Sequence, residues 1–127
     1  MSFLDQFKRM RDSGLHESWK SISNEDQLQA AIDESFEKPV VLFKHSTTCG
    51  ISAGAKHRLE LDWDFEDSEL SFYYLDLLTY RSVSNKIAAD LGVTHQSPQI
   101  IVVKNGLAVF DTSHHAINVM ALRNGLG

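Results

Sequence analysis

Residues 40–122 alternate between apolar segments of strand type and amphipathic segments of helix type, and this order limits the folds open to the chain. Strands are predicted at 40–43 and 70–78, each followed by a helix, at 52–61 and 81–91. Pro98 then opens a third apolar strand, and an Asn-Gly pair at 105–106 predicts a type I′ turn into an antiparallel fourth. A closing helix is expected at 115–122. This order predicts an α/β fold, with a central mixed sheet flanked by helices.

The amino-terminal third adds three expected elements. Residues 1–14 carry large apolar side chains at helical spacing, which predicts an amphipathic helix or arm ahead of a single domain at 15–127. A brief strand is expected around Trp19. A capping box of Ser23 and Asp26 predicts the start of a helix that Pro39 ends. Its apolar face is expected to consist of Leu28, Ala31, Ile32 and Phe36.

Composition narrows the classes of partner. The 127 residues are 43% hydrophobic and 23% charged, which fits one globular domain with a core. The net charge of −5, without a basic block, argues against nucleic acid and anionic lipid as partners. No apolar run approaches the roughly 20 residues that cross a bilayer, and no secretion signal is recognisable. We therefore expect a cytoplasmic protein without a membrane partner, and a monomer.

Cys49 is the only cysteine, and it stands between the strand at 40–43 and the helix at 52–61. In α/β sheets, reactive groups collect in the loops that lead from a strand's carboxyl end to a helix's amino end. Unpaired N–H groups and about half a positive charge at a helix amino end stabilise the thiolate, which is the nucleophilic form. Taken alone, a lone cysteine is more often an inert core residue. Its placement here favours Cys49 as a catalytic nucleophile.

Neighbouring residues are candidates for binding an incoming thiol. Ser52 follows Cys49 by three residues, so its hydroxyl is expected to return to the side of the sulfur. Lys44 and His45 are candidate sources of positive charge, although strand alternation places at most one of them on that side. The remaining candidates for thiol or substrate binding are Thr48, Gly50, Ile51, Ser97 and Pro98.

Two segments, FKHSTTCGIS at 43–52 and GVTHQSPQIIVVKNG at 92–106, resemble the YtxJ-like monothiol bacilliredoxin family, also called bacilliredoxin C. The resemblance implies a thioredoxin-like fold in which Pro98 is cis and lies against the reactive sulfur, with Ser97 offering backbone groups. It also implies that Cys49 removes bacillithiol from cytosolic proteins that carry it as a mixed disulfide. Ser52 then stands where a dithiol relative keeps its resolving cysteine. Gly50 stands where members often carry proline.

The number of cysteines decides how such a cycle would close. After Cys49 attacks a mixed disulfide, no second cysteine in the chain can release the bound thiol. Release requires bacillithiol as co-substrate or a reducing partner protein, and the other partners are S-thiolated client proteins. We expect no bound cofactor and no catalytic metal. His45 and Cys49 are four residues apart, but a strand-to-helix break between them removes the geometry of a metal site.

Two other functions remain open. Cys-Gly-Ile-Ser also resembles the Cys-Gly-Phe-Ser signature of monothiol glutaredoxins, which hold a [2Fe–2S] cluster between two subunits with a low-molecular-weight thiol. Against this, the chain after the hairpin reads VFDTSHHAI and lacks their Gly-Gly loop. The second alternative is a redox-inert thioredoxin-like interaction module.

Two further features have structural explanations. Gly54 inside a predicted helix costs about 1 kcal/mol relative to alanine, and we attribute it to close packing against a neighbouring strand. The acidic segment LDWDFEDSEL at 61–70 is predicted to be a solvated loop between elements, and a role in selecting which client proteins dock is the alternative.

Overall fold

The computed structural model describes residues 16–127, so the predicted helix at 1–14 lies outside the described residues. The described elements, in chain order, are β1 (Trp19–Ser21), α2 (Glu25–Glu34), β2 (Val40–His45), α3 (Gly50–Asp62), β3 (Ser71–Asp76), α4 (Arg81–Leu91), β4 (Gln99–Lys104), β5 (Leu107–Ser113), the 3₁₀ helix η1 (His114–Ala116) and α5 (Val119–Leu126). This is the predicted order of strands and helices.

The five strands form one mixed sheet in the order β1-β3-β2-β4-β5. β3 pairs in parallel with both β1 and β2, because helices connect these strands. β4 runs antiparallel to β2 and to β5, and a tight turn joins β4 to β5. The sheet confirms the predicted α/β class and places β2, the strand that leads to Cys49, in the middle.

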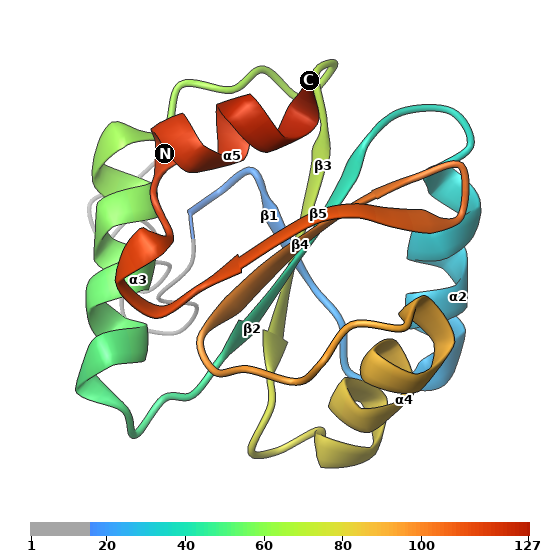
Figure 1. Cartoon of the computed structure of the whole chain (residues 1–127), viewed down its shortest axis with the longest axis horizontal. Coiled ribbons are helices and arrows are strands. Elements are labelled where there is room, and N and C mark those ends of the chain that lie inside the picture. Colours follow the sequence, from blue (N-terminus) through green and yellow to red (C-terminus); the bar gives the residue numbers. More distant parts are fainter. Residues whose placement is uncertain (1–15) are drawn as a thin grey trace, which may run out of the picture.

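Helices cover both faces of the sheet (Figure 1). On one face, α3 and α5 pack over a cluster that includes Phe43, Phe72 and Ile100. On the other face, α2 and α4 pack over a cluster centred on Leu42, Leu75 and Ile101. Alternate residues of β2 and β3 thus point into different cores, which is why these strands are apolar on both sides.

The start and end of α2 differ from the prediction. Asn24 is the N-cap residue: its side chain accepts a hydrogen bond of 2.8 Å from the N–H of Gln27. The Gln27 side chain in turn accepts one of 2.7 Å from the N–H of Ser23. The predicted box of Ser23 and Asp26 is therefore wrong by one residue. The helix ends at Glu34, well before Pro39.

Phe36 lies beyond this helix and is 63% exposed, so its predicted place on the apolar face of the helix is wrong. Its ring packs against the turn between β4 and β5. There, Asn105 and Gly106 both have positive φ angles, 52° and 77°, as the predicted turn requires. A Cβ atom at Gly106 would lie 2.9 Å from the Phe36 ring. Ser35 also fixes this turn, since its carbonyl and its hydroxyl accept hydrogen bonds from the N–H groups of Asn105 and Gly106.

Two other local predictions need correction. A Cβ atom at Gly54 would meet only the Arg58 side chain, at 3.5 Å, so no neighbouring strand requires a glycine there. The predicted closing helix at 115–122 is divided into η1 and α5, and α5 extends to Leu126. Asn118 caps α5, because its side chain accepts a hydrogen bond of 2.8 Å from the N–H of Ala121.

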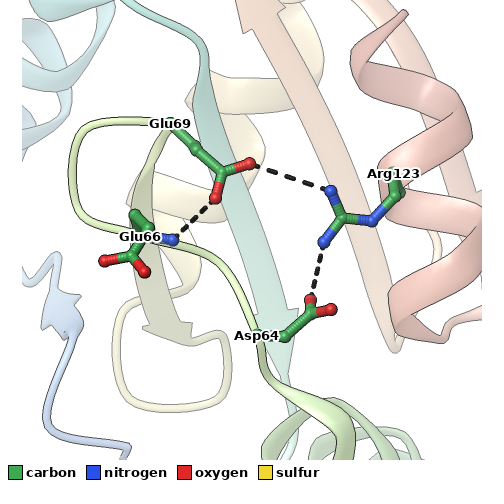
Figure 2. A network of polar contacts seen from close by, with 4 residues as sticks. All are labelled: Asp64, Glu66, Glu69 and Arg123. Carbon is green, nitrogen blue, oxygen red and sulfur yellow. Dashed lines mark hydrogen bonds and ion pairs between the residues drawn. The ribbon is translucent and has the colours of Figure 1, made fainter.

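The acidic segment at 61–70 is held to α5 and is more than a solvated loop. Figure 2 shows Arg123 of α5 reaching two of its carboxylates, at 2.7 Å for Asp64 and 3.7 Å for Glu69. The Arg123 guanidinium also lies 4.5 Å from the centre of the Phe65 ring. Each exposed ion pair contributes about 1 kcal/mol or less, but together these contacts fix the path of the segment.

Candidate active site

Cys49 is the N-cap residue of α3. Its backbone is extended, with φ −107° and ψ 124°, and its carbonyl accepts the first helical hydrogen bond, 3.0 Å from the N–H of Ala53. Its side chain is half-buried and carries a free thiol. The structure therefore places the sulfur at a helix amino end, as predicted. The helix begins at Gly50, two residues earlier than expected.

The loop between β2 and Cys49 is fixed by Ser52. This residue is fully buried, and its hydroxyl accepts a hydrogen bond of 2.9 Å from the N–H of Ser46. The carbonyl of Ser46 in turn accepts one of 3.3 Å from the N–H of Cys49. Ser46 also contacts Thr48, with 3.3 Å between the two hydroxyl oxygens. Ser52 thus holds the chain that presents the sulfur, a role that the sequence did not reveal.

Ser97 and Pro98 lie at the same edge of the sheet as the cysteine loop. The peptide bond between them is cis, as predicted. β2 and β4 pair from Val40↔Val103 to Lys44↔Gln99, and Gln99 directly follows Pro98. Because the two strands are antiparallel, β4 begins where β2 ends. The structure therefore brings the segment at 97–98 beside the end of β2, from which the cysteine loop departs.

Two buried polar residues hold the segment that leads to Pro98. The Gln99 side chain donates a hydrogen bond of 3.0 Å to the carbonyl of Thr94 and accepts one of 3.4 Å from the N–H of Gln96. The Nζ of Lys44, next to Gln99 in the sheet, lies 3.3 Å from the Nδ1 of His95. Lys44 is fully buried, and this burial lowers its pKa to about 8.

His45 points to the other face of the sheet, toward α3. Its ring packs 5.6 Å from that of Phe43 and 5.3 Å from that of Tyr74. Burial lowers the pKa of His45, and the charge of Lys56 lowers it further, against smaller opposing effects that include Asp76. Of the two predicted sources of charge, His45 lies on the α3 side and Lys44 lies on the opposite side, as strand alternation requires.

Residues on either side of Cys49 are open to solvent. Thr47, Thr48 and Gly50 are exposed, and Ile51 is 43% exposed. A Cβ atom at Gly50 would meet no atom within 4 Å outside its two chain neighbours, so the side of Gly50 that a side chain would occupy is open. The first turn of α3 is therefore accessible from solvent next to Cys49.

A pocket of about 430 Å³ opens beside this loop. Its lining consists of His45, Thr47, Ala53, Lys56, His57, Glu60 and Tyr74. Most of these residues were not predicted as site residues. The helical ones follow Cys49 at intervals of 4, 7, 8 and 11, a spacing of one helix face that could have been recognised. Tyr74 comes from β3, and only the pairing of the strands places it here.

Within the part of the chain that the structure describes, no group of three or more His, Cys, Asp or Glu side chains is arranged to hold a metal ion. Among residues 16–127, no helix is both long enough and apolar enough to cross a membrane.

The model of the monothiol bacilliredoxin family BrxC matches residues 20–122 of the chain. The chain belongs to this family. A solved structure described as an oxidoreductase with a thioredoxin fold is 33% identical, with a TM-score of 0.74; the match covers 85% of this chain and 93% of that one. Family and structure together show a thiol–disulfide oxidoreductase, with the thioredoxin-like fold that the resemblance implied.

More distant structures show the same fold. Thioredoxin from Fasciola hepatica is 21% identical, with a TM-score of 0.65, over 84% of this chain and 95% of that one. Thioredoxin from Trypanosoma brucei brucei is 15% identical, with a TM-score of 0.67, over 88% and 94%. In this bacilliredoxin family member, the chain's one cysteine stands at the junction of the β2–α3 loop and α3.

Proposed function

We propose that this chain removes bacillithiol from S-bacillithiolated proteins by monothiol exchange at Cys49. The observation that carries the proposal is the placement of the chain's only cysteine as the N-cap of α3, in a chain that belongs to the monothiol bacilliredoxins. The helix amino end turns unpaired backbone N–H groups toward the loop that carries Cys49, and the exposed first turn leaves room for a protein substrate.

The first exchange transfers the small thiol. The Cys49 thiolate attacks the bacillithiol sulfur of the mixed disulfide, forming one S–S bond as the other breaks. The client protein leaves as a thiolate and takes up a proton from solvent. Bacillithiol stays on Cys49 as a disulfide, and the total number of disulfides is unchanged.

The second exchange resets the enzyme. A free bacillithiol thiolate attacks the bacillithiol sulfur bound to Cys49, which releases bacillithiol disulfide and regenerates the thiolate. Reduction of that disulfide then falls to another enzyme. A reducing protein with its own thiol can replace bacillithiol in this step. No second cysteine competes, because the chain has one.

The setting of this reaction is part of the proposal. The clients are cytoplasmic proteins with S-bacillithiolated cysteines, and the enzyme acts as a monomer without a bound cofactor or metal. Bacillithiol is a co-substrate. The residues proposed to contact it or the client near Cys49 are Thr48, Gly50, Ile51, Ser97 and Pro98, with Lys44 and His45 as candidates for electrostatic tuning. Ser52, which is fully buried, is proposed to support the cysteine loop from within.

Intact mass spectrometry tests the proposal directly. The purified protein is mixed briefly with a client peptide carrying bacillithiol, and with matched peptides carrying glutathione or coenzyme A. We expect prompt transfer of bacillithiol to Cys49, faster than transfer of the other two thiols, and no transfer to Cys49→Ser. Equal or faster transfer of another thiol would reject bacillithiol as the preferred substrate, and no transfer of any thiol would reject the catalytic role. Visible absorbance after incubation with iron and sulfide would then favour the cluster carrier.

A further inference from the structure

The segment at 94–98, which contains the cis peptide bond, is held by hydrogen bonds on both sides of Ser97. On one side, the carbonyl of Pro98 accepts a hydrogen bond of 3.1 Å from the N–H of His114, where β5 passes into η1. On the other side, the Gln99 side chain binds two backbone groups of the segment, at 3.0 and 3.4 Å. Within residues 16–127, neither the N–H nor the carbonyl of Ser97 takes part in a hydrogen bond, so both are available to a substrate.

His95 is held as well, by a partner inside the protein. Its Nδ1 lies 3.3 Å from the Nζ of Lys44. Lys44 is fully buried whereas His95 is exposed, so the imidazole covers the amine at the protein surface. The residues before and after His95 are those that Gln99 binds. Because Lys44 and Gln99 lie opposite each other in adjacent strands, one cross-strand pair holds three successive residues of the segment.

The buried amine of Lys44 contributes to the position of this segment more than to stability. Burial disfavours a charged group, and a methionine of similar length would fill the same space without that cost. The amine offsets part of the cost through its contact with the imidazole of His95. His95 stands two residues before Ser97. The contact therefore acts on the part of the chain whose open backbone groups face an incoming substrate.

We infer that Lys44 and His95 are positioning residues for exchange at Cys49, because their contact fixes the segment at 97–98 against which a protein substrate lies. The inference rests on the proposed function for the role of that segment in binding the client. It adds two residues that act through the segment and need not touch the reacting sulfurs. Exchange requires the attacking sulfur and the disulfide to be aligned, and a displacement of about 1 Å can cost up to about 100-fold in rate.

The contact depends on the protonation state of His95. A neutral imidazole with its proton on Nε2 accepts a hydrogen bond at Nδ1 from the Lys44 ammonium, whereas a protonated imidazole has no acceptor. Burial lowers the pKa of His95, and the charges of Lys44 on β2 and Arg81 on α4 lower it further. The third group that faces the imidazole, Gln99 of β4, is neutral. The imidazole is therefore neutral at pH 7, and the contact should be lost on acidification below the pKa of His95.

Two reagents that release the same aromatic thiolate test the positioning. One is a model client peptide whose single cysteine carries thionitrobenzoate as a mixed disulfide, and the other is the symmetric thionitrobenzoate disulfide without a peptide. In both reactions the Cys49 thiolate forms one S–S bond as another breaks, and thionitrobenzoate leaves as the thiolate. The ratio of the two rates reports what the peptide contributes, because the reactivity of Cys49 itself cancels at each pH.

Three variants remove or restore the contact. Lys44→Met removes the amine, and His95→Leu removes the acceptor. His95→Gln supplies a side-chain carbonyl that accepts but does not titrate. Thr94→Leu is the matched control, because the neighbouring Thr94 side chain is also exposed and only its backbone carbonyl takes part in holding the segment. Urea unfolding at pH 7 checks that each variant is folded.

The ratio at pH 7.5 should be the same in wild type, Thr94→Leu and His95→Gln. It should be about 10-fold lower in Lys44→Met and His95→Leu, as the loss of one charged hydrogen bond provides. Between pH 7.5 and 5, the ratio should fall several-fold in wild type and stay constant in His95→Gln, a difference that a purely structural role would not produce. A wild-type ratio in Lys44→Met or His95→Leu, or a wild-type ratio that does not change with pH, overturns the inference.

Amide hydrogen exchange separates this inference from the proposed reaction. The N–H of Gln96, next to His95, should exchange about 10-fold faster in Lys44→Met than in wild type, and at the wild-type rate in Thr94→Leu. This measurement and the ratio of rates need only an accessible thiol, so both support the positioning even if bacillithiol is never transferred. Equal transfer of bacillithiol from the client peptide by Lys44→Met and wild type would leave the proposed function standing and reject the positioning.

Discussion

Replacing Lys44 with methionine tests the energetics of the buried cation beside the active site. Lys44 is fully buried, and its Nζ contacts the imidazole ring of His95. Desolvation lowers its pKa from 10.5 to about 8. A shift of that size corresponds to about 3 kcal/mol. Because Nζ lies against the exposed His95 at the end of the strand, we reduce the expected effect to about 1–2 kcal/mol for solvent screening.

The direction of the pH dependence follows from proton binding. The folded state has the lower pKa, so between pH 8 and 10.5 the unfolded state binds more protons than the folded state. The stability of the wild type therefore rises as the pH increases through this window. The methionine side chain of the variant has no proton to bind. The free energy of unfolding of Lys44→Met, relative to wild type, should be highest below pH 8 and should fall by about 1–2 kcal/mol by pH 10.

Urea unfolding of both proteins at pH 7, 8, 9 and 10 measures this difference, because effects shared by both proteins cancel. Lys86→Met serves as the control. Lys86 forms an ion pair with Asp90 on the surface, and this contact raises the pKa of Lys86. The free energy of unfolding of Lys86→Met, relative to wild type, should therefore stay constant from pH 7 to 10. If the relative free energy of unfolding of Lys44→Met were also constant over this pH range, the buried lysine would carry no desolvation cost and the prediction would be wrong.

Three further substitutions test separate parts of the fold by chemical or thermal unfolding. Gly54→Ala should raise the free energy of unfolding by about 0.5–1 kcal/mol, since a Cβ atom has room inside α3; a loss of stability would mean that the glycine is needed after all. The same change at Gly125 in α5 should cost about 1–3 kcal/mol, because a Cβ atom there would clash with the Phe110 ring. An unchanged melting temperature would contradict this. Ser52→Ala should cost about 1–3 kcal/mol by leaving the buried N–H of Ser46 without its acceptor, and an effect below about 0.5 kcal/mol would argue against that role.

The topology was predictable because it depends on periodicity. The apolar strands, the helices between them and the turn at Asn105 and Gly106 each have a local signature, and the rules for connections then leave few arrangements. Element ends were less predictable. Ser23 and Asn24 are both good N-cap residues. Asn24 is the cap in the structure because its side chain accepts from the N–H of Gln27, while the Gln27 side chain accepts from the N–H of Ser23.

Side chains that act across strands could not be predicted from the sequence. Phe36 has the spacing of a core residue of α2, but the helix ends before it and its ring instead covers Gly106, far along the chain. In the same way, the contact between Lys44 and His95 depends on the register in which Lys44 lies opposite Gln99. A shift of the strand register by one residue would turn Lys44 to the other face of the sheet.

The candidate active site has one part that was predictable from a local pattern and one part that depends on contacts across strands. The position of Cys49 was predictable, because a strand followed by a cysteine and a helix is a local pattern. What surrounds the sulfur depends on alternation along β2, where Lys44 and His45 point to opposite faces. Lys44 holds the segment before Pro98, while His45 lines the pocket along α3. Two adjacent residues of one strand thus connect the cysteine loop to the cis-proline segment on one side and to the pocket along α3 on the other.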